Sequence, residues 1–451
     1  MKPTVIVIFG VTGDLSRRKL LPALYHLISQ DLLDKKTRII GVSRSKVTVD
    51  KLLDQVELCV LEADKICDPK GLQKLHDALQ LVQLDPTVAD DYDKLARLLD
   101  SFDTKGRRDR LMYMAIPPSA YTPIIKQLGA HKLNDSRTRL LVEKPFGHDV
   151  ASAEKLVRIT NEHFDESQVY RIDHYLAKET AQNLLAFRLN NPIFAALWND
   201  EHIDRVHIRA HESLGIEGRA DFYERTGALR DIIQSHLMQL LSVVMMDQPL
   251  SNSSEDIRTA KLAFLKSLAP ADPTKAARAQ YKGYRDEVGN PSSRTETYAL
   301  IELQSELDRW RDTEIILETG KALSEKTTEV IVRFKYPHER RRNQLSFRLQ
   351  PNEGISLDLF VKAPGFDNQM HGTELDFSYK NTFTNQPGHP DAYERVIMDA
   401  VKGDQSLFSS SEELLTAWEV VQPVLDAWAA SRKPIRQYTR GSQDPLKPKM
   451  K

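Results

Sequence analysis

The chain has 451 residues, which is too long for one ordinary hydrophobic core and therefore predicts at least two domains. Its 63 basic and 64 acidic residues nearly cancel, so no overall field attracts nucleic acid or an anionic membrane. Cys59 and Cys67 form no metal or redox motif, a sparse use of cysteine that is typical of a reducing cytosol. The longest apolar run is about half of a membrane span and no leader pattern is evident, so we expect a cytoplasmic protein.

The first third of the chain alternates between strand-like and helix-like patterns. Residues 4–10 form a short β-branched apolar run of the kind that is buried on both faces of a parallel sheet. A helical pattern follows, and residues 37–43, 110–118 and 137–147 give further strands. This alternation favours an α/β Rossmann-like dinucleotide-binding domain, which we place at residues 1–172.

The turn after the first predicted strand carries two glycines, Gly10 and Gly13, rather than the complete three-glycine fingerprint. Gly10 permits a tight turn, and Gly13 lets the backbone approach a pyrophosphate at the helix N-terminus. Because the motif follows the first strand and opens the first helix, it predicts nucleotide binding. The other cofactor candidates in this turn are Thr12, Asp14 and Leu15.

The end of the second predicted strand indicates which nucleotide is bound. NAD-specific folds usually place an acid there for the ribose hydroxyls, whereas this chain has Ser43, Arg44 and Ser45. A guanidinium binds a 2′-phosphate through charge-assisted hydrogen bonds, which contribute about 1.5–3 kcal/mol. The sequence therefore favours NADP, and the alternative is an ordinary surface arginine.

Lys144, in the motif EKPFG, follows another predicted strand. A cis Lys144–Pro145 bond would fix this lysine at the carboxyl edge of the sheet, where doubly wound folds hold their ligands. From there the ammonium group could reach both the cofactor and a substrate hydroxyl. The alternative is a loop lysine that caps a strand end.

The stretch RIDHYLAKE, at residues 171–179, concentrates polar side chains. If the stretch is helical, His174 and Lys178 are four residues apart and share a face that could grip a phosphate. Asp173 and Tyr175 would flank them. The alternative is an exposed helix start whose polar residues meet only water.

Strand-like segments joined by loops dominate the rest of the chain. They predict a larger α+β domain on a mainly antiparallel sheet at residues 173–451, with one face left for a partner subunit. Residues 227–241 are predicted to form a helix, on which Asp231 and His236 would lie about 140° apart. If His236 is a base, its carboxylate must come from elsewhere, and Asp173 is the candidate. The alternative for His236 is a core histidine with no chemistry.

Five motifs now stand in order along the chain: GVTGDLSRRKLLPALY, EKPFG, RIDHYLAKE, RDIIQSHLMQ and GKAL. Together they resemble glucose-6-phosphate dehydrogenases over nearly the full length, with Ala177 in place of the family's usual glycine. The resemblance implies oxidation of glucose 6-phosphate at C1 to 6-phosphogluconolactone with NADP, the entry step of the pentose phosphate pathway. It also implies a homodimer or homotetramer and no metal, since the nicotinamide accepts the hydride.

The resemblance implies a role for each matching position. His236 corresponds to the catalytic base and Asp173 to the carboxylate that holds it. The substrate phosphate would be held by His174, Tyr175 and Lys178, and the sugar by Lys144, Glu212, Asp231, Lys321 and Lys326. The cofactor contacts would be Gly10, Thr12, Gly13, Asp14, Leu15, Arg44, Asp85 and Lys144.

Two other functions stay open at this point. A Gfo/Idh/MocA-like sugar oxidoreductase shares the nucleotide domain, the sheet-rich domain and the EKP motif, but is not expected to carry RIDHYLAKE or the paired Lys321 and Lys326. A catalytically inactive NADP-binding homologue is expected to have lost His236, Asp173 or Lys144, and all three are present.

Overall fold

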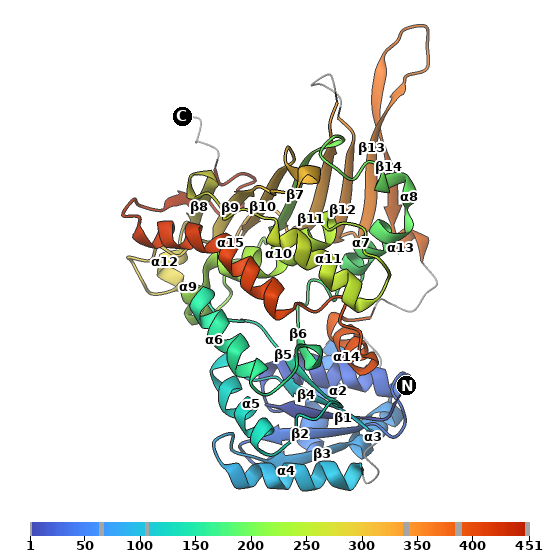
Figure 1. Ribbon diagram of the computed structural model, residues 1–451, viewed down its shortest axis with the longest axis vertical. Helices are drawn as coiled ribbons and strands as arrows, with labels where there is room; N and C mark the ends of the chain where they lie inside the picture. Colours follow the sequence, from blue (N-terminus) through green and yellow to red (C-terminus); the bar gives the residue numbers. More distant parts are fainter. Residues whose placement is uncertain (1, 63–66, 104–107, 337–341, 384–389, 447–451) are drawn as a thin grey trace. The chain divides into compact units, whose positions relative to one another are not determined.

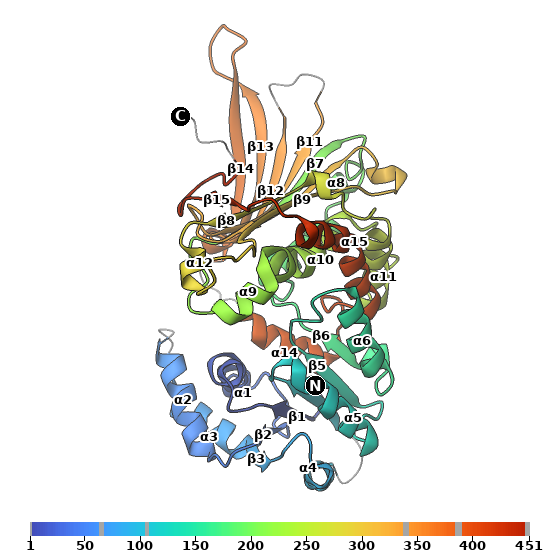
Figure 2. The same cartoon turned by 90° about the vertical axis from the view of Figure 1, so that its left-hand side faces the viewer.

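The computed structural model describes residues 2–62, 67–103, 108–336, 342–383 and 390–446, which Figures 1 and 2 show from two sides. The chain divides into two compact units. The first unit comprises Met1–Gly147, Ala151–Ala177 and His389–Ser411, and the second comprises His148–Val150, Lys178–Gly388 and Glu412–Lys451. None of the described helices is both long and apolar enough to span a bilayer.

The first unit is built on a six-stranded parallel sheet with the strand order β3-β2-β1-β4-β5-β6. Its strands are β1 (Thr4–Phe9), β2 (Arg38–Ser43), β3 (Leu79–Gln83), β4 (Asp109–Met114), β5 (Thr138–Val142) and β6 (Val169–Arg171). The order reverses between β1 and β4, as in a doubly wound dinucleotide-binding fold. The predicted Rossmann-like fold is therefore confirmed.

Helices cover both faces of this sheet. Successive residues of a strand point to opposite faces, yet every residue from Val5 to Phe9 of β1 is at most 1% exposed. The helical segments in this part of the chain are η1 (Ser16–Leu20), α1 (Leu21–Ser29), α2 (Val49–Glu62), α3 (Pro69–Ala78), α4 (Ala89–Phe102), η2 (Pro118–Ala120), α5 (Tyr121–Ala130), α6 (Val150–Asn161) and η3 (Glu166–Gln168). A helix from much later in the sequence, α14 (Ala392–Lys402), packs in the same unit against α1 and β4.

The second unit is built on a nine-stranded sheet with the strand order β14-β13-β12-β11-β7-β10-β9-β8-β15. Its strands are β7 (Ile203–His211), β8 (Ala276–Tyr281), β9 (Tyr298–Leu303), β10 (Glu314–Gly320), β11 (Thr327–Phe334), β12 (Gln344–Gln350), β13 (Gly354–Lys362), β14 (Met370–Ser378) and β15 (Arg436–Tyr438). The pairs β7–β10 and β8–β15 are parallel, and the other described pairs are antiparallel. This confirms the predicted mainly antiparallel sheet.

Helices lie along one face of the nine-stranded sheet, as α10, α11 and α15 do in both figures. The helical segments are α7 (Glu179–Asn190), α8 (Pro192–Ala195), α9 (Ala220–Ala228), η4 (Leu229–Leu237), α10 (Met238–Met245), α11 (Ser254–Lys266), η5 (Pro273–Lys275), α12 (Tyr284–Glu287), η6 (Asp308–Trp310), α13 (Tyr379–Thr382) and α15 (Ser411–Ala430). Apolar and polar residues alternate along β7, which explains why helices cover one face of the sheet. Val206 and Ile208 are fully buried. Arg205, His207 and Arg209 pair with acids on neighbouring strands.

The stretch RIDHYLAKE is a turn, not the helix that its spacing suggested. Residues 174–177 form the turn, and α7 begins only at Glu179, so His174 and Lys178 do not share a helix face. The cause is Asp173, whose Oδ1 accepts hydrogen bonds from the backbone N–H groups of Tyr175 at 2.8 Å and Leu176 at 3.4 Å. Asp173 and Tyr175 are each only 5% exposed, so the alternative of an exposed helix start is also wrong.

The predicted helix that carries Asp231 and His236 is present, but its hydrogen bonding differs from that of an α-helix. Residues 229–237 form the π-helix η4, in which each amide bonds five residues back. The Ser235 hydroxyl donates to the Asp231 carbonyl at 2.7 Å, an acceptor that the Ser235 amide would use in an α-helix. Asp231 and His236 are therefore one π-type turn apart, and the 140° separation expected from the α-helical repeat is wrong.

Candidate active site

The turn after β1 forms a backbone cradle at the carboxyl edge of the parallel sheet. Gly10 has a φ of +85°, and its amide donates to the Val42 carbonyl at 3.0 Å. A Cβ atom at Gly10 would lie 2.5 Å from the Ala115 carbonyl oxygen, so both the backbone angle and the space require glycine. Gly13 donates to the Gly10 carbonyl at 2.9 Å, where the chain turns into its first helix. This geometry fits a pyrophosphate bound by backbone amides at a helix start.

The side chains of this turn differ in exposure. Thr12 and Leu15 are partly buried, whereas Asp14 is exposed. The Asp14 carboxylate forms an ion pair of 2.8 Å with the Arg18 guanidinium one helical turn later. This pairing offsets the negative charge that Asp14 would otherwise present to an anionic ligand.

Arg44 and Asp85 follow β2 and β3, two neighbouring parallel strands, and both side chains are exposed. The Gln83 side-chain amide donates to the Arg44 carbonyl at 3.0 Å, which fixes the backbone at Arg44. Hydrogen bonds from Thr87 hold the pKa of the Asp85 carboxyl below its usual value, and the nearby Arg44 charge adds to this effect. The structure therefore brings these two predicted cofactor residues together.

Glu143, next to Lys144, was not singled out from the sequence, although it belongs to the quoted motif EKPFG. Its Oε1 accepts a hydrogen bond from the Tyr113 hydroxyl at 2.6 Å, and the Lys144–Pro145 bond is cis. Loss of hydration raises the pKa of the Glu143 carboxyl to about 7; the charge of Asp173 acts in the same direction, and Tyr113 and Lys144 oppose it. The charges of Lys144 and Asp173 thus both act on this partly buried carboxyl.

The remaining residues of RIDHYLAKE lie on either side of the division between the units, which falls between Ala177 and Lys178. In the first unit the rings of His174 and Tyr175 meet edge to face, with centroids 5.1 Å apart. In the second unit the Lys178 ammonium donates to Oε1 of Gln350 at 2.8 Å. A common phosphate grip by these three residues stays a prediction.

In the second unit, the parallel pairing of β7 with β10 sets Glu212 beside Lys321. His211, the last residue of β7, is the register partner of Gly320, the last residue of β10. Glu212 and Lys321 are the residues that follow them. The Lys321 ammonium is paired with the Glu212 carboxylate, with side-chain exposures of 3% for the lysine and 33% for the glutamate. The pair is therefore anchored on its lysine side and open on its carboxylate side.

The start of η4 is held by a buried acid, Glu296, whose Oε1 accepts a hydrogen bond from the Leu229 amide at 3.1 Å. Burial raises the pKa of the Glu296 carboxyl. Gly227 makes room for it: its φ is +70°, and a Cβ atom there would lie 2.4 Å from Oε1 of Glu296. This arrangement fixes the helix that carries Asp231, which is partly buried, and His236, which is 1% exposed.

The roles of Lys326 and of the pair His236 and Asp173 stay predictions. Lys326 is an exposed residue directly before β11. His236 belongs to the second unit and Asp173 to the first, so the interaction between them stays a prediction.

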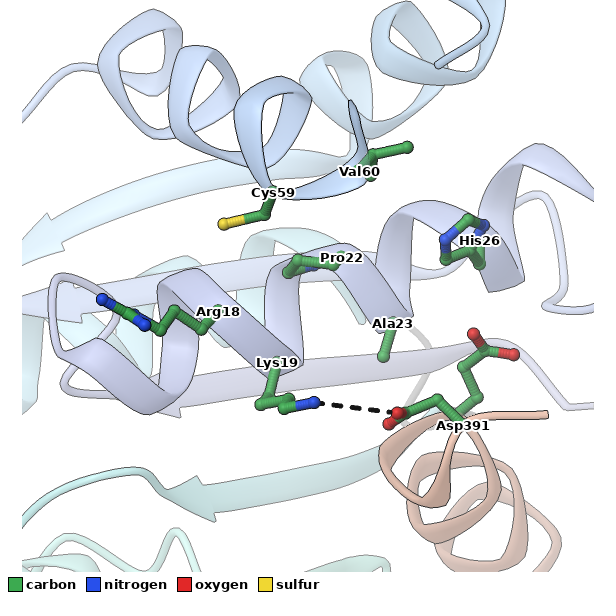
Figure 3. Close-up of a pocket in the computed structure, with 9 residues that line it drawn as sticks. Arg18, Lys19, Pro22, Ala23, His26, Cys59, Val60 and Asp391 are labelled. Atoms are coloured by element: carbon green, nitrogen blue, oxygen red, sulfur yellow. Dashed lines mark ion pairs between the residues drawn. The ribbon is translucent and has the colours of Figure 1, made fainter. Parts of the chain in front are cut away.

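A cavity of about 100 Å³ in the first unit lies beside η1 and α1, apart from the predicted site residues (Figure 3). Arg18, Lys19 and Cys59 line it together with Asp391, and the Lys19 ammonium lies 3.9 Å from the Asp391 carboxylate. Because the Lys19 ammonium faces Asp391 within the cavity and the Arg18 guanidinium is paired with Asp14, we assign no ligand to it. Among the residues described, no three His, Cys, Asp or Glu side chains are grouped as a metal site would require.

Comparison with known families matches almost the whole chain. Residues 7–183 match the glucose-6-phosphate dehydrogenase NAD binding domain, and residues 185–450 match the glucose-6-phosphate dehydrogenase C-terminal domain. The chain is 36% identical to glucose-6-phosphate 1-dehydrogenase of Rhizobium meliloti, over 99% of this chain and 95% of that protein. It is 38% identical to glucose-6-phosphate 1-dehydrogenase of Gluconobacter oxydans, again over 99% and 95%. The first unit is therefore a dinucleotide-binding domain.

Solved structures give the same result. A glucose-6-phosphate dehydrogenase in complex with its substrate glucose-6-phosphate superposes with a TM-score of 0.92 at 33% identity, covering 99% of this chain and 96% of that one. A levoglucosan dehydrogenase in complex with NADH and L-sorbose has a TM-score of 0.53 at 8% identity, over 94% and 97% of the two chains. The second likeness is one of fold alone.

The pKa of Glu143 leads to a prediction about stability. A raised folded-state pKa means that the stabilisation is complete below the unfolded-state pKa, near 4.5, and is lost as pH rises through about 7. Glu143→Gln, which stays neutral, should therefore match the wild type near pH 4, below the unfolded-state pKa. Near pH 8 it should exceed the wild type in free energy of unfolding by up to about 3 kcal/mol.

Urea denaturation across this pH range measures the difference between the two proteins. The matched control is Glu154→Gln, the same replacement at an exposed glutamate of α6. A constant difference between Glu143→Gln and the wild type would show that the carboxyl keeps its normal pKa in the folded protein.

Proposed function

The chain belongs to the glucose-6-phosphate dehydrogenase family, and from this premise we propose which residues carry out its reaction and that NADP is its cofactor. The reaction is the oxidation of glucose 6-phosphate at C1 to 6-phosphogluconolactone. The observation that carries this function is the family match from residue 7 to residue 450, through both domains. The residue roles below are consistent with the geometry within each unit.

His236 is the base of the proposed mechanism. As the C1–H bond breaks, the C1 hydroxyl must lose its proton, and a neutral imidazole near pH 7 can accept it. Asp173 holds the second ring N–H of His236 and stabilises the imidazolium that forms. The turn supports this role, because the backbone N–H groups of Tyr175 and Leu176 fix the Asp173 carboxylate through its Oδ1.

The substrate phosphate is remote from C1, and its binding supplies orientation rather than chemistry. His174, Tyr175 and Lys178 hold it in this proposal. Charge-assisted hydrogen bonds from the Lys178 ammonium contribute most to such a grip. The Gln350 side chain, which accepts from Lys178 in the structure, keeps the ammonium in place until phosphate binds.

The sugar ring contacts a second set of residues: Lys144, Glu212, Asp231, Lys321 and Lys326. The Glu212 carboxylate is well suited to this task, because Lys321 neutralises it from the buried side and its exposed side can accept from sugar hydroxyls. This fixed pair needs little reorganisation when the sugar binds.

NADP is held by the turn of Gly10, Thr12, Gly13, Asp14 and Leu15 and by Arg44, Asp85 and Lys144. In this proposal the tight turn at Gly10 brings the start of the first helix to the pyrophosphate, and the Arg44 guanidinium meets the 2′-phosphate. When bound, the nicotinamide accepts the hydride from C1.

The same family relationship supports three further proposals. Residues 1–172 bind the cofactor, and residues 173–451 carry the substrate-binding residues and the subunit contact. The protein is a homodimer or homotetramer, and it works in the cytoplasm.

The test of this function is nicotinamide reduction by the purified chain, with glucose 6-phosphate or glucose and with NADP or NAD. We expect reduction that requires both the phosphate and NADP. Equal use of plain glucose would instead indicate a general sugar oxidoreductase. NADP binding without any reduction would indicate an inactive homologue.

Replacement of Arg44 tests the cofactor assignment. Because a charge-assisted hydrogen bond contributes about 1.5–3 kcal/mol, Arg44→Ala should weaken NADP binding roughly ten- to a hundredfold and leave NAD binding nearly unchanged. Dissociation constants from titration calorimetry give both values. The control is Arg38→Ala, at the opposite end of β2. Equal weakening of both nucleotides would place the 2′-phosphate elsewhere.

Replacement of His236 tests the base. His236→Ala should bind NADP normally and lose about 10²–10⁴ in turnover, since general-base catalysis contributes that much. Stopped-flow and steady-state reduction rates measure the loss. The control is His202→Asn, at an exposed histidine of the same unit that contacts Asn199. Turnover close to that of the wild type would rule out His236 as the base.

A further inference from the structure

Tyr223, on α9, has an unexplained hydroxyl. The side chain is fully buried, and its ring lies 6.2 Å from that of Tyr284 in a cluster of tyrosines. Among the residues that the structure describes, its hydroxyl oxygen has no hydrogen-bond partner. The hydroxyl groups of Tyr281, Tyr284 and Tyr298 in the same cluster donate to glutamates at 2.8–2.9 Å. A buried hydroxyl without a hydrogen-bond partner is energetically unfavourable, and Tyr223 lacks the acceptor that the neighbouring tyrosines have.

The surroundings of Tyr223 are those of the proposed sugar site. The Lys321 ammonium lies 5.1 Å from the centre of the Tyr223 ring, within the range of a cation–π contact. The same ammonium is paired with Glu212. Burial and the charges of Asp231, Glu296 and Glu212 raise the pKa of the Tyr223 hydroxyl, which therefore stays protonated and can donate.

We infer that Tyr223 is a further substrate-binding residue, whose hydroxyl donates to a hydroxyl oxygen of the sugar while its aromatic ring positions the Lys321 ammonium. This inference rests on the proposed function, because it takes Glu212, Asp231 and Lys321 as the sugar contacts. It explains the orphan hydroxyl: its partner arrives with the substrate. It also explains why a tyrosine stands where packing alone needs only a phenylalanine.

Tyr223→Phe removes the hydroxyl and keeps the ring. We expect the KM for glucose 6-phosphate to rise about three- to tenfold, as for one lost hydrogen bond, with kcat and the KM for NADP within about twofold of the wild type. Tyr223→Leu also removes the ring face under Lys321 and should raise the KM further. The matched control is Tyr284→Phe, which removes a hydroxyl that donates to Glu224 in the same cluster.

Deoxy analogues of glucose 6-phosphate identify the contact. One analogue, lacking the hydroxyl that Tyr223 contacts, should lose affinity with the wild type but show no further loss with Tyr223→Phe. A purely structural tyrosine would give equal losses in both proteins for every analogue. The inference is overturned if Tyr223→Phe leaves the KM for glucose 6-phosphate unchanged, as it would if ordered water satisfied the hydroxyl.

A binding measurement separates this inference from the function on which it rests. Glucose 6-phosphate should raise the melting temperature of the wild type more than that of Tyr223→Phe. An equal rise in both proteins would overturn the role of Tyr223 alone. No rise in the wild type, together with no reduction of NADP, would overturn the proposed function and the inference with it.

Discussion

The parallel pairing of β7 with β10 is the constraint on which the ion pair of Glu212 with Lys321 in the second unit depends. A lysine that is 3% exposed needs a partner, since a buried charge without one is strongly destabilising. The register of His211 with Gly320 supplies that partner by carrying Glu212 and Lys321 off the same edge of the sheet. An antiparallel pairing would send the two segments to opposite edges. The ion pair of Glu212 with Lys321 is therefore possible because β7 and β10 are parallel in a sheet that is otherwise mainly antiparallel.

Each unit also contains a glutamate that has lost much of its hydration. Glu143 in the first unit and Glu296 in the second are acids whose pKa burial raises, and each bonds to a neighbouring group, Tyr113 or the Leu229 amide. Glu143 precedes Lys144, and Glu296 binds the start of the helix that carries His236. Such carboxyls add little charge while protonated, so they hold backbone and side chains in place without competing for a cationic partner.

The sequence predicted those parts of the structure that local patterns determine. The Rossmann-like unit follows from its strand–helix alternation, and the glycine at position 10 from a turn that tolerates no side chain. The helix expected over RIDHYLAKE was wrong because the hydrogen bonds that Asp173 accepts from the Tyr175 and Leu176 amides outweigh the helical spacing. Strand order and register are non-local, so neither the β7–β10 pair nor the packing of α14 with the first unit could be derived from local patterns. The environment of Glu143 is non-local for the same reason.

The π-helix η4 has a consequence for how this chain can vary. Its turns hold one more residue than α-helical turns, so a single deletion between Leu229 and His236 can be absorbed by a return to α-type bonding. Helix α10 would keep its place, while Asp231 would shift to a new position around the helix axis relative to His236. Chain length, and not only residue identity, thus sets the alignment of these two side chains. A count of substitutions between relatives does not register such a change.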